Sequence, residues 1–171
     1  MNTFRIGIAI AVVCTIAFAS TAFSQDNSAR EAKDRAEIES LMWHYARALD
    51  TGDGTAYAAT YTVDGQFGTG ANATKGREAL KKMVDGPREQ QAAAKAKGEP
   101  ARPPLYHMET NTWIEFIDKD HANYHAYYLT ASGAGGPNEP PRIAAAGRSV
   151  NYLERVNGKW LIKLRDVAPK D

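Results

Sequence analysis

The chain of 171 residues carries 21 Lys and Arg against 20 Asp and Glu, so its formal net charge is +1 at pH 7. This length suits one domain that buries roughly two-thirds of the surface of its unfolded chain. Because the charges are balanced, the sequence gives no electrostatic basis for binding nucleic acid or an anionic membrane.

Residues 1–24 have the composition of a secretory signal peptide. Arg5 supplies the positive charge, an apolar run of about 14 residues follows, and residues 22–24 form a small-x-small cleavage site, with Ala19 as the second choice. The run is shorter than the roughly 20 residues that span a bilayer, so we expect cleavage, a secreted or periplasmic protein and no membrane attachment. Cys14, the only cysteine, lies in this leader, so we expect no disulfide or thiolate metal site afterwards.

A long helix is predicted after residues 25–33, which are polar and expected to form a flexible linker. Ser28 or Asp34 can cap its start. Apolar residues then recur at helical spacing and form one stripe, made of Ile38, Leu41, Met42, Tyr45, Ala48 and Leu49. Asp50 lies at the C-terminal end of this stripe, and Gly52 can end the helix in the left-handed conformation.

The next predicted elements are shorter. Asp53 is expected to cap a second helix that runs through Tyr61, and residues 62–65 carry a turn signal before a strand. A third helix is expected over residues 76–84. From residue 85 to residue 104 the composition turns to Gln, Ala, Lys, Arg, Gly and Pro, which predicts an exposed, partly helical excursion with no role in chemistry.

Alternating side chains predict long antiparallel strands in the second half of the chain. On the strand over residues 105–117, one face is expected to carry His107, Glu109, Asn111, Trp113 and Glu115. On the strand over residues 122–130, His125 and Tyr127 are expected opposite Tyr124 and Tyr128.

Residues 143–156 and 159–167 are predicted to form a hairpin. They are joined by Asn157-Gly158, which favours a type I′ turn because both residues accept positive φ. Helices grouped before a strand-rich half indicate an α+β domain in which a curved antiparallel sheet wraps around the long helix.

Four segments carry a resemblance to a known family: residues 37–67, the GREAL motif at 76–80, His107 with Asn111, and YLERVNGKWLIKLRDV at 152–167. In their order and spacing they resemble the SnoaL-like branch of the nuclear transport factor 2-like superfamily. The resemblance implies a SnoaL-like domain over residues 34–168, a cone-shaped α+β barrel enclosing a pocket, and often a homodimer. Since such folds host many functions, the chemistry has to be argued from the site.

Asp50 and His107 are similar in position to the aspartate and histidine that transfer protons in dehydratases, isomerases and cyclases of this superfamily. A carboxylate beside an imidazole suits this chemistry because histidine titrates near neutrality. The structural alternative is that Asp50 caps the helix end and His107 is a wall residue. We expect a small hydrophobic or aromatic ligand and no cofactor, with a substrate-binding set made of Tyr45, Tyr57, Phe67, Asn111, Trp113, His125 and Tyr127.

Two departures weaken the case for an enzyme. Fungal dehydratases of this fold carry a second histidine near the position of Ala131, and a tyrosine where this chain has Leu49. The alternatives are a non-catalytic module that binds a small hydrophobic ligand and an accessory domain that dimerises. In the second case the exposed aromatics are predicted to be Tyr106, Tyr124 and Tyr128.

A zinc site made of His107, Glu109 and His125 is a further alternative. It depends on the strand register, and the spacing matches no compact metal motif, so no metal is predicted.

Overall fold

The computed structural model describes residues 6–100, 102–134 and 138–170. The chain separates into two compact units, Met1–Ile38 and Glu39–Asp171. The elements are α1 (Ile6–Thr51), α2 (Gly54–Ala59), β1 (Tyr61–Phe67), the 3₁₀ helix η1 (Gly70–Asn72), β2 (Thr74–Lys75), α3 (Arg77–Ala96), β3 (Leu105–Phe116), β4 (His121–Ser132), β5 (Arg142–Val156) and β6 (Lys159–Asp166).

The first helix begins earlier than the sequence suggested. We expected a start at Ser28 or Asp34, whereas the helical backbone is continuous from Ile6, and residues 25–33 belong to it. Good helix formers and an i,i+4 pair, in which Lys33 Nζ lies 3.6 Å from a Glu37 carboxylate oxygen, favour helix in this segment.

The predicted leader is only partly described, because residues 1–5 lie outside the described residues. Its cleavage stays a prediction. Among the helices of the described residues, none combines the length and apolar character that crossing a membrane requires.

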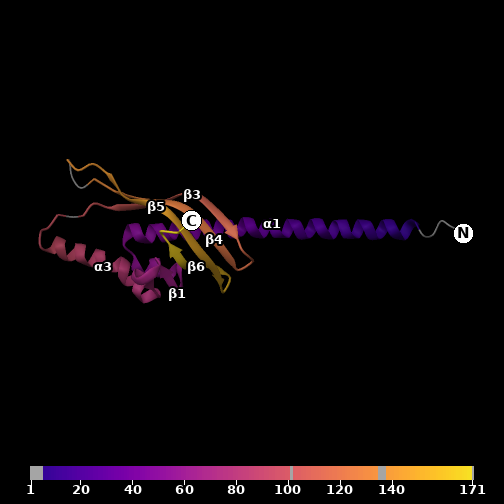
Figure 1. Ribbon diagram of the computed structural model, residues 1–171, viewed down its shortest axis with the longest axis horizontal. Helices are drawn as coiled ribbons and strands as arrows, with labels where there is room; N and C mark the ends of the chain where they lie inside the picture. Colours follow the sequence, from indigo (N-terminus) through magenta and orange to yellow (C-terminus); the bar gives the residue numbers. More distant parts are fainter. Residues whose placement is uncertain (1–5, 101, 135–137, 171) are drawn as a thin grey trace. The chain divides into compact units, whose positions relative to one another are not determined.

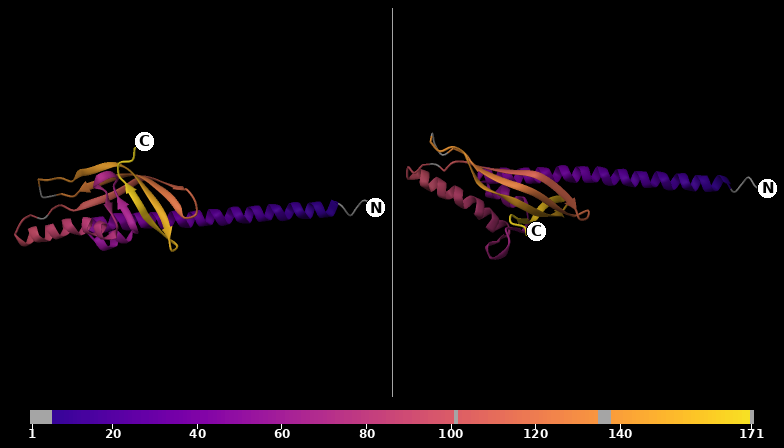
Figure 2. Two further views of the ribbon diagram at one scale, coloured as in Figure 1. Left: turned by 60° about the horizontal axis from the view of Figure 1, so that its bottom comes forward. Right: turned by 45° about the horizontal axis from the view of Figure 1, so that its top comes forward.

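The unit Glu39–Asp171 contains a six-stranded sheet in the order β2-β1-β6-β5-β4-β3. Figure 1 labels all of these strands except the short β2. β1 and β6 run parallel, and the other neighbours are antiparallel. Figure 2 shows that the long strands are bent. The α+β class, with a curved sheet and an N-terminal helix, is therefore confirmed. The sheet is mixed rather than wholly antiparallel, and it is not closed into a barrel, since β2 and β3 form its two edges.

Turns and caps follow the residues that predicted them. Asn157 and Gly158 have φ values of 51° and 77° and close the β5–β6 hairpin, and Gly52 ends α1 at φ 65°. Asp53 caps α2 by accepting a hydrogen bond from the Ala56 N–H at 2.9 Å. α2 is shorter than predicted, because β1 already begins at Tyr61. Residues 62–65, which were predicted to form a turn, also belong to β1.

The helix α3 continues past the point where it was expected to end. It includes most of the predicted excursion and contains Pro87. Proline has no N–H, so Pro87 cannot donate to the carbonyl of Met83 one turn earlier. Leu80 and Val84 are the buried residues of α3 and form its apolar face.

The buried face of the sheet, here called the inner face, packs against the C-terminal part of α1. The Arg165 guanidinium of β6, for example, lies 4.6 Å from the ring centroid of Tyr45 in α1. Side chains buried in the core include Met42, Tyr57, Leu80, Ile114, Tyr124, Ala126, Leu153 and Ile162. The opposite, outer face leaves Trp113, Tyr127 and Tyr152 exposed.

A bulge in β3 changes which of its side chains face inward. His107 pairs with Thr130 and Glu109 with Tyr128, but the register shifts between Thr110 and Trp113, where Asn111 has a φ of 48°. Trp113 then pairs with His125 on the outer face. The predicted single face from His107 to Glu115 is therefore wrong, because one extra residue exchanges the two faces of a strand.

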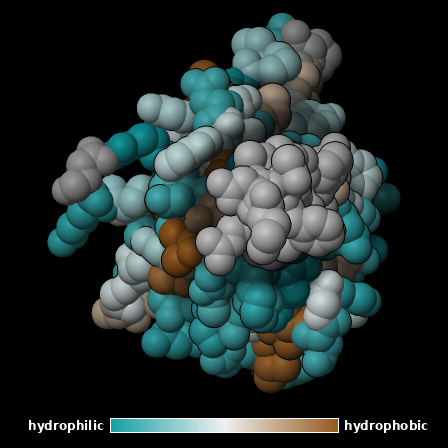
Figure 3. Space-filling model, turned by 90° about the vertical axis from the view of Figure 1, so that its right-hand side faces the viewer, coloured by the Kyte–Doolittle hydropathy of each residue, from teal (hydrophilic) through white to brown (hydrophobic). Residues whose placement is uncertain are grey.

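Hydrophilic residues dominate the surface in Figure 3. Among the described residues in that view, hydrophobic ones form only small separate groups.

Candidate functional site

Asp50 and His107 meet where the end of α1 approaches the start of β3. One carboxylate oxygen of Asp50 accepts a hydrogen bond from His107 Nδ1 at 2.8 Å and another from the His107 backbone N–H at 2.9 Å. The exposed fractions of their side chains are 15% for Asp50 and 25% for His107. An ionised carboxylate can only accept, so this bond fixes the proton of neutral His107 on Nδ1 and leaves Nε2 as the basic nitrogen.

The pair lines a cavity of about 510 Å³ in the unit Glu39–Asp171. The end of α1 contributes residues 49–52, and β3 contributes Leu105 and His107. The remaining lining residues are Met83, Val84, Pro87, Arg88 and Gln91 of α3, followed by Arg102, Pro103 and Pro104. Residues 85–104, the excursion to which the sequence assigned no chemistry, therefore supply six of these lining residues.

The predicted binding residues Tyr45 and Tyr57 lie in the core, outside this cavity. With Tyr61 they form a cluster of rings whose centroids are 5.2 to 6.3 Å apart. The hydroxyl groups of Tyr57 and Tyr61 lie 2.9 Å apart, and burial raises the pKa of both phenols. Phe67 is half-buried at the end of β1, in register with Arg165.

The other predicted binding residues are not brought to the pair. Trp113 stacks on His125 with 5.0 Å between ring centroids, and Tyr127 is exposed on the same outer face. Asn111 is exposed at the bulge. On β4 the even-numbered residues face inward, so Tyr124 and Tyr128, which were expected to be exposed, belong to the inner face.

The same register separates the residues of the zinc alternative. His107 and Glu109 face inward, whereas His125 faces outward. Across the described ranges, no group of three His, Cys, Asp or Glu residues is placed to hold a metal ion.

The sequence reasoning missed a buried charged pair two residues beyond His107. Arg165 donates one hydrogen bond to Glu109 and another, of 2.9 Å, to Asn151 Oδ1. Burial raises the pKa of the Glu109 carboxyl, and the charge of Arg165 opposes this shift. Glu109 Oε2, Ser149 Oγ and Arg165 Nε are buried and find no hydrogen-bond partner among the described residues. The sequence offered one signal for Glu109: it lies two residues after His107 on a predicted strand, so both side chains are expected on the same face.

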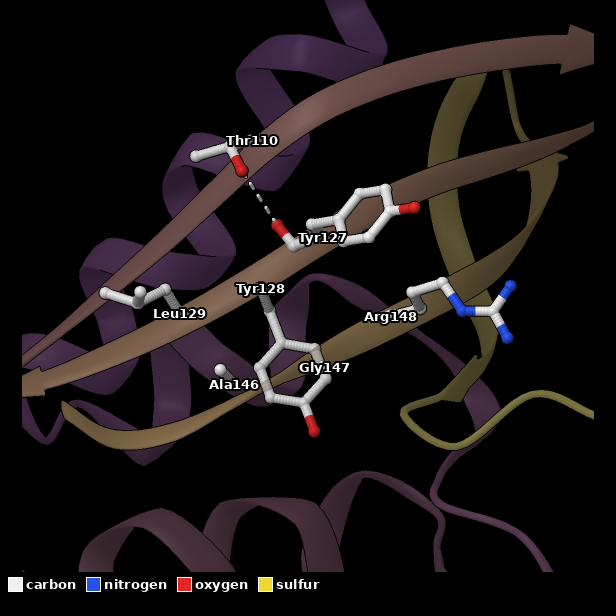
Figure 4. A pocket seen from close by; sticks show the side chains of 7 residues that line it. All are labelled: Thr110, Tyr127, Tyr128, Leu129, Ala146, Gly147 and Arg148. Carbon is white, nitrogen blue, oxygen red and sulfur yellow. Dashed lines mark hydrogen bonds between the residues drawn. The ribbon is translucent and has the colours of Figure 1, made fainter.

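A second hollow, here called the strand groove, lies on strands β3, β4 and β5 alone (Figure 4). Its volume is about 690 Å³, and it is lined by Thr110, Tyr127, Tyr128, Leu129, Ala146, Gly147 and Arg148. Thr110 donates to the Tyr127 carbonyl at 3.5 Å. The ring of Tyr128 lies so close to Gly147 that a Cβ atom there would come within 2.7 Å of its hydroxyl oxygen. These lining residues include one charged group, Arg148, and no carboxylate or imidazole.

The open curved sheet with its helices is the fold of the nuclear transport factor 2-like class. A protein of that class from Novosphingobium aromaticivorans, with a cystatin-like fold, superposes with a TM-score of 0.65 at 20% identity, covering 82% of this chain and 84% of its own. Within this class the chain belongs to the SnoaL-like domain family, which matches residues 30–166. The resemblance read from the sequence is thereby confirmed. No curated protein matches the chain significantly.

Two further solved structures share the fold. A candidate scytalone dehydratase from Novosphingobium aromaticivorans is 22% identical, with a TM-score of 0.65 over 84% of this chain and 89% of its own. A protein from Catenulispora acidiphila, solved in complex with S-DNPA, is 23% identical, with a TM-score of 0.61 over 78% of this chain and 91% of its own. At these identities the likeness concerns the fold.

Proposed function

We propose that this SnoaL-like protein binds a small hydrophobic molecule in the cavity beside His107 and transfers a proton on it, as a lyase or isomerase without a cofactor. The observation that carries the proposal is the pair of hydrogen bonds from His107 to a single carboxylate oxygen of Asp50. A candidate scytalone dehydratase and a ligand complex among the structural neighbours are consistent with it.

The pair has the geometry of an oriented base. Asp50 fixes the imidazole tautomer and stabilises the imidazolium that forms when Nε2 takes a proton, as the aspartate does in Ser-His-Asp triads. The proton comes from a carbon next to a substrate carbonyl. The same imidazolium then returns a proton to another carbon in an isomerisation or to a departing hydroxyl in a dehydration.

Deuterium exchange tests this chemistry before the substrate is known. Wild-type protein in D₂O is expected to accelerate deuterium incorporation into cyclohexanone at the carbon next to the carbonyl. Scytalone is a second probe, and its reaction is measured as the loss of water. His107→Gln and Asp50→Asn, each shown to be folded by circular dichroism, should lower the rate by about 10²- to 10⁴-fold. Variants that match the wild type, or a wild-type rate equal to buffer, would contradict the proposal.

A non-catalytic binding module is the second candidate, and the incomplete set of dehydratase residues around the cavity favours it. His107 is the only imidazole among the lining residues, and apolar Leu49 stands in the cavity wall where related dehydratases carry a tyrosine. Ala131, near the expected second histidine, pairs with Tyr106 on the outer face. This candidate predicts a ligand that co-purifies with the protein and binds equally well to wild type and His107→Gln.

We also propose that the chain is exported and forms a homodimer. Export is supported by the leader composition of residues 1–24. N-terminal sequencing of protein from the extracellular or periplasmic fraction tests it, and an intact Met1 there would contradict cleavage. The dimer is supported by the exposed aromatic side chains of the outer face.

A further inference from the structure

We infer that the cavity beside His107 is built for a ligand that joins an apolar body to an anionic group, bound by Arg88 and Arg102. This inference rests on the proposed function, because it names the substrate class of the same site. It gives a role to the excursion after residue 85, to which the sequence assigned none.

The charges around the cavity are unbalanced. Its lining residues include two arginines, Arg88 and Arg102, and one acidic residue, Asp50. The hydrogen bonds from His107 already occupy one oxygen of the Asp50 carboxylate. Within the described residues, no salt bridge joins Arg88 or Arg102 to a carboxylate. Asp85, on the same helix as Arg88, makes its hydrogen bonds to Lys81 and to the Gly54 N–H at 3.0 Å, and it interacts with Arg88 only through space.

The local structure holds Arg88 at the cavity. Its Nη1 donates to the Gly52 carbonyl at 3.3 Å. Its aliphatic stem lies over Gly52, where a Cβ atom would come within 3.2 Å of Arg88 Cδ. The glycine that ends α1 therefore also makes room for this side chain.

Arg102 is brought to the cavity by the chain that follows α3. Gln91 Nε2 of α3 donates to the Arg102 carbonyl at 3.4 Å. Pro103 and Pro104, which restrict the backbone, come directly after it. Both are lining residues, so this segment presents an arginine and an apolar surface to the same space.

The rest of the lining defines the other part of the ligand. Leu49, Met83, Val84, Pro87 and Leu105 supply an apolar surface. Guanidinium groups bind carboxylate, sulfonate and phosphate through paired N–H donors, and they do so without losing their charge. An apolar molecule with such a group would lie along the wall with its anionic end at the arginines and its body beside His107.

Cinnamate and cinnamamide test the inference, because the two probes have the same apolar body and differ only at one end, where the charged carboxylate of cinnamate is replaced by a neutral carboxamide. Ligand-observed NMR titration of the full protein should give a Kd about 10-fold lower for cinnamate. Arg88→Gln and Arg102→Gln should each weaken cinnamate binding by about 5-fold and leave cinnamamide unchanged, as expected for partly exposed ion pairs. Arg148→Gln, in the strand groove, is the matched control and should change neither value.

Equal affinities for the two probes, binding of neither, or a loss of cinnamate binding in Arg148→Gln alone would overturn the inference. Glutamine retains two methylene groups of the arginine stem, so the packing over Gly52 is largely kept, and circular dichroism verifies folding. The titration does not depend on turnover. Equal Kd values for cinnamate and cinnamamide would therefore overturn the anion site without contradicting the proton-transfer proposal. Unchanged turnover of the His107→Gln protein would contradict proton transfer without contradicting the anion site.

Discussion

Two hollows of this protein, the cavity beside His107 and the strand groove, have similar volumes, about 510 Å³ and about 690 Å³, but very different linings. The cavity beside His107 collects side chains from α1, α3 and β3, whereas the strand groove is lined by neighbouring strands alone. Only the first contains an imidazole and a carboxylate, which are hydrogen-bonded to each other.

The difference shows that convergence of separate elements, rather than size, distinguishes a candidate active site. Side chains from one sheet lie in a flat row, while a helix end, a helix face and a strand can point groups toward one space from different directions. The two faces of the sheet repeat the contrast. The inner face buries a charged pair beside His107, and the outer face exposes aromatic rings.

The largest expected effect is on catalysis and compares the two hollows directly. If Asp50 acts only through His107, the double variant Asp50→Asn with His107→Gln should be no slower than the His107→Gln single variant. Rates of deuterium exchange into cyclohexanone measure this. Arg148→Gln should keep the wild-type rate. Additive losses would show that Asp50 acts independently of His107.

Removal of Arg165 should have the largest effect on stability. Arg165→Met leaves the Glu109 carboxylate buried without its partner, which is expected to cost about 3–5 kcal/mol of unfolding free energy at neutral pH. Urea denaturation followed by circular dichroism gives this value.

Arg148→Met serves as the control on the outer side of β5. Because Arg148 is exposed, the loss of its charge should lower the unfolding free energy by no more than about 1 kcal/mol, the range found for surface ion pairs. If the two variants were equally stable, the Glu109–Arg165 pair would not be a stabilising part of the inner face.

A smaller effect concerns pH. Burial raises the pKa of Glu109, so the folded protein holds this proton more tightly than the unfolded chain does. The unfolding free energy contributed by this difference in proton binding is fully present below the pKa of Glu109 in the unfolded chain, about 4.3. It is lost as the pH rises through the higher pKa of Glu109 in the folded protein. Relative to Glu109→Gln, the wild type should therefore lose unfolding free energy between pH 4 and pH 7 in urea titrations. A relative gain over this range would show that Arg165 outweighs desolvation.

Local signals in the sequence predicted much of the fold. Gly52, Asp53 and Asn157-Gly158 act through their own backbone conformation or side-chain reach, and the structure places each as expected. Asp50 and His107, 57 residues apart, were paired from the family resemblance, and the structure joins them.

The binding residues on the strands could not be predicted because their faces depend on register. One bulge near Asn111 sends Trp113 outward, and alternation on β4 was assigned to the wrong face, which exchanged Tyr127 with Tyr128. The buried pair of Glu109 and Arg165 depends on the pairing of distant strands. No local pattern encodes that pairing.

The smallest stability effect is expected on the outer face, where Trp113 and Tyr127 are 57% and 52% exposed. Trp113→Ser with Tyr127→Ser should change the unfolding free energy of the monomer by no more than about 1 kcal/mol, because little area is lost from the core. If this face joins two copies, the same change should instead halve the mass measured by light scattering. Val63→Ser, 75% exposed on β1, controls for the loss of an apolar surface residue and should leave the mass unchanged. If the double variant is still a dimer, the dimer interface does not include these rings. If the wild type is a monomer, the outer face does not join two copies of the chain.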